Sequence, residues 1–458
     1  MTASRTATPT LFVALDIGKN VHWLGCYDDQ LTALVEPHKV RSTMPGFAHF
    51  QRTVDPLLHD EHFARVVIGN EYTGIYHEPW AWQIRQHYLA APTPCPVTYH
   101  WLNPILSKRR QQQRSIRQHS TDARAVAAIA ACLRDGLGYP AHFPSAIEAQ
   151  LREAVRARAQ LRRQRRHLGR RLHSQIDRLW PGALVKVKRF QHAHPELEPP
   201  QPIVKSKPLD RQCIAALFLH CPNPYDALAL DVSGLIALLR QHVGRGGPKT
   251  AQKILDVLRD APLPPPAIAS CYASRLQDDF RAYTDLQERF AALDRQLKRW
   301  VPQTDARFLA SVPGISPVLA ARYFAPIRTI DRFSSAAQIW AYAGLDPVSA
   351  ASGDTKHVGH MSKRGPSTLR DTLFQIGQHT STYCTPIGEA FLRARRRGLS
   401  TIQATLHAAH KANRLCFALL RDRHSYRPVA PARQSRFRQA YQAYQTARRA
   451  RARPRIAA

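Results

Sequence analysis

Three acidic residues in the first third of the chain, Asp16, Glu71 and Asp122, stand where their carboxylates could act together. Asp16 follows an apolar run of strand-forming residues at 11–15, Glu71 follows a similar run at 64–70, and Asp122 falls in the first turn of a predicted helix. A carboxylate at the end of a buried strand must be paired, hydrogen-bonded or bound to a metal. Two alternatives remain open: Asp16 is a surface residue just past its strand, and Asp122 is a favourable charge at a helix N-terminus.

The placing of these acids resembles the RNase H/RuvC-like nuclease fold, in which acidic residues at such positions hold divalent metal. Hard cations take oxygen ligands, and carboxylates that converge without a cation repel one another. The resemblance therefore implies a Mg²⁺ (or Mn²⁺) site made by Asp16, Glu71, His119 and Asp122. His119 stands where many members of the fold have Asp, and its neutral imidazole would favour Mn²⁺ over Mg²⁺. The alternative for His119 is a surface residue that flanks the helix.

A second group of reactive residues lies in the segment 342–373, which reads YAGLDPVSAASGDTKHVGHMSKRGPSTLRDTL. Ser352 belongs to a predicted loop of small residues that can approach a phosphate closely. The side chains expected to hold phosphate oxygens follow it: Lys356, His357, His360, Lys363 and Arg364. A serine hydroxyl needs a base or a metal to become a nucleophile at neutral pH. An ordinary loop serine is the alternative, and the other candidate serines are Ser349, Ser362 and Ser367.

Together these motifs resemble the transposases of the insertion sequence 110 family. The order YAGLDP, Ser-Gly, GHMSKRG and LR is similar to the C-terminal domain of the family, and ALDIGK, GNEYTGIY and TDAR are similar to its N-terminal DEDD domain. The resemblance spans most of the chain apart from about 181–262 and the tail. It implies a serine transposase guided by a bridge RNA, with Ser352 as the nucleophile that forms a phosphoserine link to DNA. It also implies a homo-oligomer (dimer or tetramer), because the metal site of one subunit would lie against the serine domain of another.

The charge balance of the chain favours a polyanionic partner. Its 458 residues include 66 Lys and Arg against 33 Asp and Glu, a formal net charge of +33. Nucleic acid is the leading partner, because each phosphate that is neutralised releases counterions. A membrane surface is the rival, but no apolar run approaches the ~18 residues of a spanning helix. The eight cysteines form no C-x-x-C pair, which is typical of reduced thiols in a cytoplasmic protein, here expected to be nucleoid-associated and bacterial.

The order of elements predicts an α/β domain followed by mostly helical regions. Strands are expected at 11–15, 21–27, 31–35, 64–70 and 96–100, with helices at 45–58, 76–88 and 121–133. The domains expected along the chain are a RuvC-like metal-binding domain at 1–142, coiled-coil helices at 143–180 and 265–300, a helical insert with a Pro-rich linker at 181–264, a helical serine transposase domain at 301–430 and a basic tail at 431–458. The tail interleaves Arg with aromatic residues, and we expect it to be disordered until it binds nucleic acid.

Two helical features are candidates for nucleic-acid contact. The predicted helix at 146–180 has one arginine-rich face, with the candidate contacts Arg162, Arg163, Arg165 and Arg166. It pairs with the heptad-like stretch at 276–300, with another subunit, or as part of a globular bundle. The segment 308–327 resembles a helix-hairpin-helix, in which the turn at Gly314 offers backbone N–H groups to a phosphate. A plain connector between helices is the alternative at Gly314.

The sequence therefore predicts an RNA-guided DNA transposase. Two rival hypotheses remain. In the first, the chain is a metal-dependent nuclease or junction resolvase that uses water as the nucleophile, and Ser352 is structural. In the second, it is a decayed transposase that binds nucleic acid without catalysis, with His119 as the mark of a lost metal site.

Overall fold

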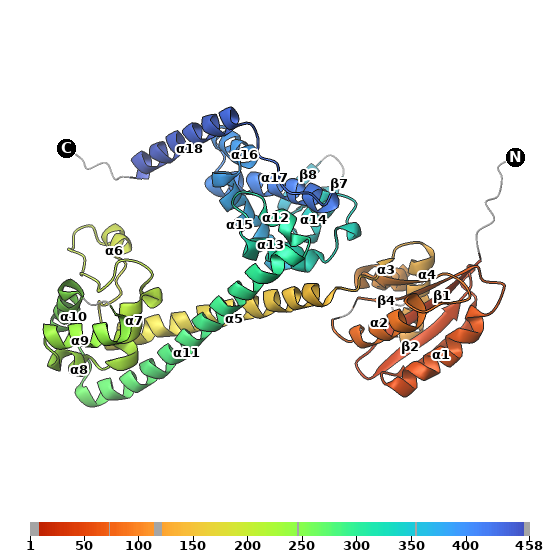
Figure 1. The fold of residues 1–458 in the computed structure, drawn as a ribbon, viewed down its shortest axis with the longest axis horizontal. Helices are drawn as coiled ribbons and strands as arrows, with labels where there is room; N and C mark the ends of the chain where they lie inside the picture. The colour runs from red at the N-terminus through yellow and green to blue at the C-terminus, as the bar shows by residue number, and fades with distance from the viewer. Residues whose placement is uncertain (1–8, 73, 114–120, 245–246, 353–354, 453–458) are drawn as a thin grey trace. The chain divides into compact units, whose positions relative to one another are not determined.

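The chain folds as two compact units, Met1–Phe143 and Pro144–Ala458 (Figure 1). The computed structural model describes residues 9–72, 74–113, 121–244, 247–352 and 355–452, with side chains at all of these except 348–360, 451 and 452. His119 therefore lies outside the described residues, and Ser352 is described by its backbone alone. Each unit has its own hydrophobic core.

A mixed sheet of six strands forms the centre of the first unit, in the order β3-β2-β1-β4-β5-β6. The strands are β1 Thr10–Ile17, β2 Val21–Tyr27, β3 Ala33–Arg41, β4 Arg65–Glu71, β5 Val97–Leu102 and β6 Tyr139–Pro140. Strand β1 pairs antiparallel with β2 and parallel with β4, and the β2–β3 pair is antiparallel. The third strand starts later than predicted and continues to Arg41. The sequence did not predict this extension, because its residues are polar. A largely exposed edge strand does not need the alternation of apolar residues that marks a buried strand.

Helices cover both faces of this sheet. The helices of the unit are α1 Met44–Leu58, α2 Glu78–Ile84, α3 Pro104–Gln113 and α4 Asp122–Arg134. One face of β1, with Leu11, Val13 and Leu15, packs against α1 and α2, and the other face, with Phe12 and Ala14, packs against α4. The alternation of the strand thus sends successive side chains into two separate cores. The expected mixed α/β domain is confirmed, and a mostly helical remainder follows it.

Two long helices, α5 Ala146–Leu179 and α11 Pro266–Trp300, pair with each other within the second unit (Figure 1). They run antiparallel, because Leu151 shares a core with Leu297 at one end and Ile176 shares another core with Leu276 at the other. Near the second end, Arg171 Nε donates to Asp279 Oδ2 at 2.6 Å. The sequence left open whether the first helix pairs with the second, with another subunit, or within a globular bundle. In the structure α5 pairs with α11 of the same chain.

The remaining helices build a body at each end of this pair. The helical insert contains α6 Val187–Ala193, α7 Gln212–His220, α8 Pro224–Ala229, α9 Val232–Val243 and α10 Pro248–Asp260. The C-terminal body contains α12 Ala306–Ala310, α13 Pro317–Ile327, α14 Ala336–Tyr342, the hairpin strands β7 Pro347–Ser352 and β8 Thr355–Met361, α15 Ser367–Tyr383, α16 Thr385–Arg396, α17 Thr401–Arg421 and α18 Pro431–Ala452. The insert packs on Leu172 to Leu179 of α5, and the C-terminal body packs on Leu151 to Val155.

The C-terminal segment differs from the disordered tail that we expected. It forms the helix α18, and Phe437 is 5% exposed within the core of the C-terminal body. Tyr441 and Tyr444 pack against the same core. The expectation was wrong because the aromatic residues that suggested base stacking are spaced three and four residues apart, so they share one helix face that the protein itself buries.

None of the helices in the described part of the chain is long and apolar enough to span a membrane.

Candidate active site

Asp16 lies near the end of β1 on the face of the sheet that α4 covers. Its position follows from strand alternation, since Phe12 and Ala14 of the same face are buried under α4. Asp16 pairs with Trp23 on β2, and Trp23 pairs with Lys39 on β3. Directly paired residues of neighbouring strands point to the same face. Asp16, Trp23 and Lys39 therefore form one row across three strands.

Asp122 is the first residue of α4 and meets this row. Thr121 caps the helix, and its hydroxyl accepts a hydrogen bond from the backbone N–H of Arg124. An open pocket of about 280 Å³ is lined by Asp16, Asp122, Trp23 and Lys39, together with Gly18 and Val21. The sheet and the N-terminus of α4 thus bring two of the predicted carboxylates into one pocket.

The third acid, Glu71, acts on this pocket electrostatically. Partial burial, with the negative charges of Glu71 and Asp122, raises the pKa of Asp16 to about 6. Glu71 does not line the pocket. It is the last residue of β4, and its Oε1 accepts a hydrogen bond of 2.6 Å from Oγ of Ser107, a buried residue of α3. The three predicted acids are therefore close enough to interact electrostatically, and the interaction contributes to the raised pKa of Asp16.

The donor chemistry of this pocket fits a divalent cation. Its acids are hard oxygen donors. Burial and the negative charges of Glu71 and Asp122 raise the pKa of Asp16, and a bound cation would oppose this rise. Among the side chains that the structure describes, which do not include His119, no three Asp, Glu, His or Cys residues lie together as a ready metal site. Asp16 and Asp122 form the centre of the candidate site, and Glu71 stands to one side.

Trp23 and Lys39 are residues of this pocket that sequence reasoning missed. Lys39 Nζ lies 5.5 Å from the centroid of the Trp23 ring, a cation–π distance, and Lys39 is exposed. An exposed ammonium next to two carboxylates can pair with a phosphate that approaches them. The register of two successive hairpins would have revealed the row, but the sequence alone did not extend β3 as far as Lys39.

Ser352 is the last residue of β7, in a two-stranded hairpin. Its backbone pairs with Thr355 of β8, so it stands at the tip of the hairpin. The sequence had predicted an irregular loop here, because a run of Ala and Ser carries little strand preference. Lys356 and His360 belong to β8, and their side chains lie outside the described set.

The base of this hairpin is clamped by the two motifs that flank it. The backbone N–H of Ser362 donates to the carbonyl of Asp346 at 2.9 Å, and Ser362 Oγ donates to Asp346 Oδ1 at 2.6 Å. Gly344 has φ +67°, and a Cβ there would lie 2.2 Å from the carbonyl oxygen of Arg364. The sequences YAGLDP and GHMSKRG therefore contact each other. Lys363 and Arg364 remain exposed beside the clamp.

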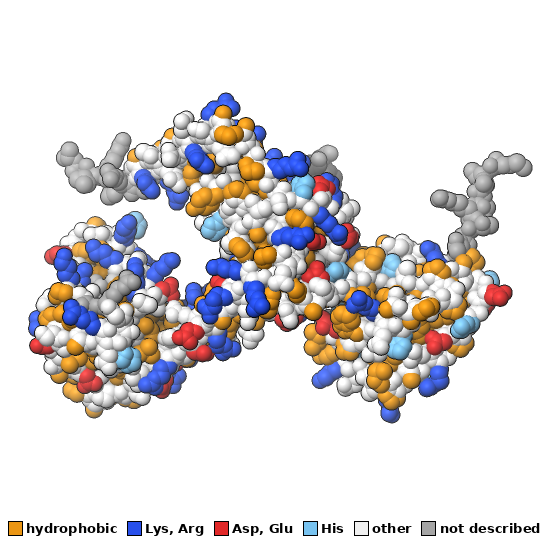
Figure 2. All heavy atoms as spheres, viewed as in Figure 1, with side chains coloured by type: hydrophobic (Ala, Val, Ile, Leu, Met, Phe, Trp, Pro, Cys, Tyr) orange, Lys and Arg blue, Asp and Glu red, His pale blue; other side chains and the backbone are white. Residues whose placement is uncertain are grey.

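The four arginines predicted to contact nucleic acid divide into two pairs. Arg162 forms an ion pair with Asp371 of α15 at 2.8 Å, and the Arg165 guanidinium lies 5.1 Å from the centroid of the Phe290 ring of α11. These two have contacts within the protein. Arg163 and Arg166, in contrast, are exposed on α5. Figure 2 shows Lys and Arg side chains on both the helical insert and the C-terminal body.

Gly314 lies in the turn between α12 and α13, as the helix-hairpin-helix pattern predicted. Its φ is +96°, and a Cβ there would lie 3.0 Å from the backbone of His379 and Thr380 in α15. Close packing against α15 is thus a structural reason for glycine at this position. A contact between this turn and a phosphate remains a prediction.

Comparison with known proteins identifies the family. Residues 306–412 match the model described as "Transposase IS116/IS110/IS902 family", and residues 13–181 match the DEDD model of IS110 transposases, described as "Transposase". A "Probable family 20 transposase" of Pseudomonas aeruginosa is 30% identical over 44% of this chain and 60% of its own length. An IS110 protein of Streptomyces coelicolor is 26% identical over 52% of this chain and 58% of its own. An IS116 protein of Streptomyces clavuligerus is 29% identical over 33% of this chain and 38% of its own length.

These three relatives are matched over less than two thirds of their own lengths. The two family models nevertheless match both of the regions in which the candidate site residues lie. The chain belongs to the IS110/IS116 family of insertion-element transposases.

Proposed function

We propose that this protein is a DNA transposase, or recombinase, that cuts and rejoins DNA through the hydroxyl of Ser352. The observation that carries the proposal is the pocket of Asp16 and Asp122, in which burial and the neighbouring acids together raise the pKa of Asp16, in a chain of this family. The clamped hairpin adds support, because Ser352 is at the tip of a braced element rather than in an unsupported loop. Pre-organisation of this kind lowers the entropic cost of holding a nucleophile against a phosphate.

In this proposal Asp16 and Asp122, with Glu71 and His119, would hold a Mg²⁺ or Mn²⁺ ion. Once bound, such an ion would offset negative charge on the phosphate oxygens. Lys39 of the same pocket would contact a neighbouring phosphate. The pocket belongs to the first unit and Ser352 to the second, which is compatible with a homo-oligomer in which the two come from different subunits.

The proposed chemical step exchanges one phosphodiester for another. The bond between Ser352 Oγ and the DNA phosphorus forms while a P–O bond of the DNA backbone breaks, and the hydroxyl proton passes to a base as the leaving oxygen gains one. Rejoining reverses the exchange with a new DNA hydroxyl. Lys356, His360, Lys363 and Arg364 would hold the phosphate oxygens.

A non-coding guide RNA that selects the DNA sites is the finer part of the proposal. The net charge of +33 fits two nucleic-acid partners. Arg163 and Arg166 are the contacts proposed on α5, because both are exposed while Arg162 and Arg165 have contacts within the protein. The Gly314 turn is a further proposed phosphate contact.

The test is a trapping experiment on nicked suicide DNA substrates that carry the ends of the element, with the guide RNA and Mg²⁺ or Mn²⁺ present. We expect a protein–DNA adduct that survives denaturation, lost in Ser352→Ala and kept in the control Ser349→Ala. DNA binding should be unchanged in both variants. We also expect Asp16→Ala and Glu71→Ala to lose activity but not RNA binding. Free 5′-phosphate ends without an adduct would instead indicate a nuclease that uses water.

A further inference from the structure

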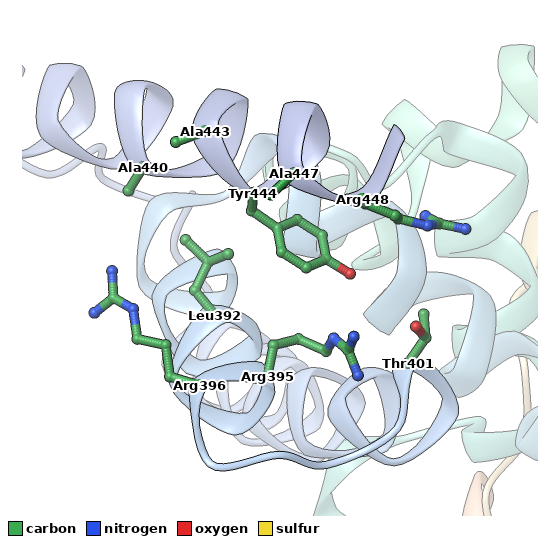
Figure 3. Close-up of a pocket in the computed structure, with 9 residues that line it drawn as sticks. All are labelled: Leu392, Arg395, Arg396, Thr401, Ala440, Ala443, Tyr444, Ala447 and Arg448. Atoms are coloured by element: carbon green, nitrogen blue, oxygen red, sulfur yellow. The ribbon is translucent and has the colours of Figure 1, made fainter. Parts of the chain in front are cut away.

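A groove of about 670 Å³ lies between α16 and α18 and reaches Thr401, the first residue of α17 (Figure 3). Its floor is formed by Leu392 of α16 and by small residues of α18: Ala440, Ala443 and Ala447. Those alanines recur at helical spacing, so α18 presents only methyl groups along this line. Near the groove the ring of Phe437 packs directly on Gly388 of α16, where a Cβ would lie 2.1 Å from it. The groove is thus a built feature of the helix pair.

The polar groups of the groove are cationic. Arg395 and Arg396 of α16 and Arg448 of α18 line it, and no acidic side chain is among its described lining residues. Figure 3 shows Arg396 and Arg448 at opposite ends, with Tyr444 reaching from α18 toward Arg395 between them. The groove therefore offers positive charge along its length and an apolar floor.

The surrounding segment contains too few acids to neutralise this charge. Residues 385–452 include 15 Lys or Arg and only two acids, Glu389 and Asp422. Glu389 is paired with Arg433 at 2.6 Å, and Asp422 with Arg421 at 2.7 Å. Because both acids are already paired, no carboxylate of this segment is left to neutralise the arginines of the groove, which favours an anionic ligand.

Two polar atoms at the groove lack partners. Nε of Arg395 and the hydroxyl of Tyr444 are both screened from solvent, and neither has a hydrogen-bond partner among the described residues. Buried polar atoms are nearly always hydrogen-bonded in folded proteins. Arg395 also donates from Nη1 to the carbonyl oxygen of Leu399, and its guanidinium lies 5.8 Å from the centroid of the Tyr444 ring. A ligand with acceptor oxygens would have to displace Arg395 from these contacts to bond to both atoms.

We infer that this groove binds the sugar–phosphate backbone of a single nucleic-acid strand. Phosphates supply the acceptors and the negative charge, and the apolar floor with Tyr444 suits sugars and bases, as in other grooves for single strands. Arginines at both ends fit a chain of phosphates better than one isolated anion. The inference rests on the proposed function in that the protein acts on nucleic acid. It adds a binding site whose α18 wall lies beyond residues 306–412, the range of the C-terminal family match.

The test measures binding of the full-length protein to fluorescein-labelled oligothymidylate and oligouridylate of about 15 nucleotides by fluorescence anisotropy, in EDTA. EDTA removes catalysis, so the result is independent of the serine chemistry. In Arg396→Gln/Arg448→Gln, two phosphate contacts are lost, so we expect binding about 10-fold weaker near 0.15 M salt and a salt slope smaller by about 1.4. The DNA and RNA probes show which strand the groove prefers.

Two further variants separate the groove from general electrostatics. Arg436→Gln/Arg438→Gln removes the same charge from exposed positions of α18 outside the groove lining, and we expect less than about a 3-fold loss. Ala443→Trp fills the groove without changing charge, and we expect it to weaken binding as much as the first pair. Equal effects of the two arginine pairs, or unchanged binding in Ala443→Trp, would overturn the inference. If the variants bind as expected while no DNA adduct forms, the inference that the groove binds a nucleic-acid strand is supported and the proposed serine mechanism is contradicted.

Discussion

Ser107 Oγ, on α3, donates a hydrogen bond to Glu71 Oε1 at the end of β4, at 2.6 Å. Ser107 is 2% exposed and Glu71 is half-buried, so water reaches this bond only from the side of Glu71. It occupies one carboxylate oxygen of Glu71 and leaves the other available. The position of the Glu71 carboxylate, whose charge acts on Asp16, thus depends on a residue that carries no charge.

Ser107→Ala should therefore weaken metal binding without removing a predicted ligand. Loss of a hydrogen bond that orients a ligand commonly lowers metal affinity about 10-fold or more. The free energy of unfolding should fall by about 1 kcal/mol. Mn²⁺ titration by calorimetry and urea unfolding measure the two effects. Wild-type Mn²⁺ affinity in a folded Ser107→Ala protein would show that Glu71 is not part of the metal site.

Asp16→Asn should stabilise the protein when no metal is present. Because the pKa of Asp16 is raised from 3.8 to about 6, the unfolded chain loses this proton first. Stability thus falls as pH rises from about 4 to 6 and stays lower above that range. After allowance for the partial exposure of the group, the effect is about 1–2 kcal/mol at pH 7.5.

Urea unfolding in EDTA across this pH range checks the prediction, with the exposed Glu61→Gln as the control. Mn²⁺ should raise the unfolding midpoint of the wild-type protein but not that of Asp16→Asn. A pH profile that Asp16→Asn leaves unchanged would contradict the clustering of the acids.

Gly344→Ala should disrupt the base of the hairpin that carries Ser352. The new Cβ would lie 2.2 Å from the Arg364 carbonyl oxygen, and φ is +67°. We expect a loss of more than about 2 kcal/mol of stability, from backbone strain and the clash together. Gly398→Ala is the matched control, since its φ is +85° with nothing within 4 Å. A loss in Gly344→Ala no larger than in Gly398→Ala would argue against the clamp.

Phe437→Ala should release α18 from the C-terminal body. Phe437 is 5% exposed and contacts Gly388, so its removal forfeits up to about 3–5 kcal/mol of packing. Hydrogen exchange of the 431–452 amides should become much faster, while exchange in α17 changes little. Gln439→Ala, at an exposed position of the same helix, is the control. Rapid exchange of 431–452 in the wild-type protein would contradict the packed helix α18 and would support the disordered tail that the sequence predicted.

The strands that carry Asp16 and Glu71 could be predicted from sequence because their apolar runs are buried on both faces. Asp122 could be located because its helix is amphipathic and capped. Lys39 could not, because it lies on an exposed edge strand where burial leaves no pattern. Its place beside Asp16 depends on the register of two hairpins.

The C-terminal half shows a second limit. Composition marked Arg162 and Arg165 as nucleic-acid contacts, but charge alone does not tell a guanidinium that faces solvent from one that pairs with Asp371 or lies over Phe290. The partners are far away in sequence and meet only in the folded chain. The same holds for Phe437, whose burial depends on Gly388.

Mass spectrometry of the trapped protein–DNA adduct tests the proposed chemistry most directly. After nuclease and protease digestion, we predict a nucleotide remnant linked through phosphate to Ser352, lost in Asp16→Ala and in EDTA. A remnant on Ser349, Ser362 or Ser367 would contradict the assignment of Ser352. Efficient cleavage with no remnant on any serine would contradict the serine mechanism.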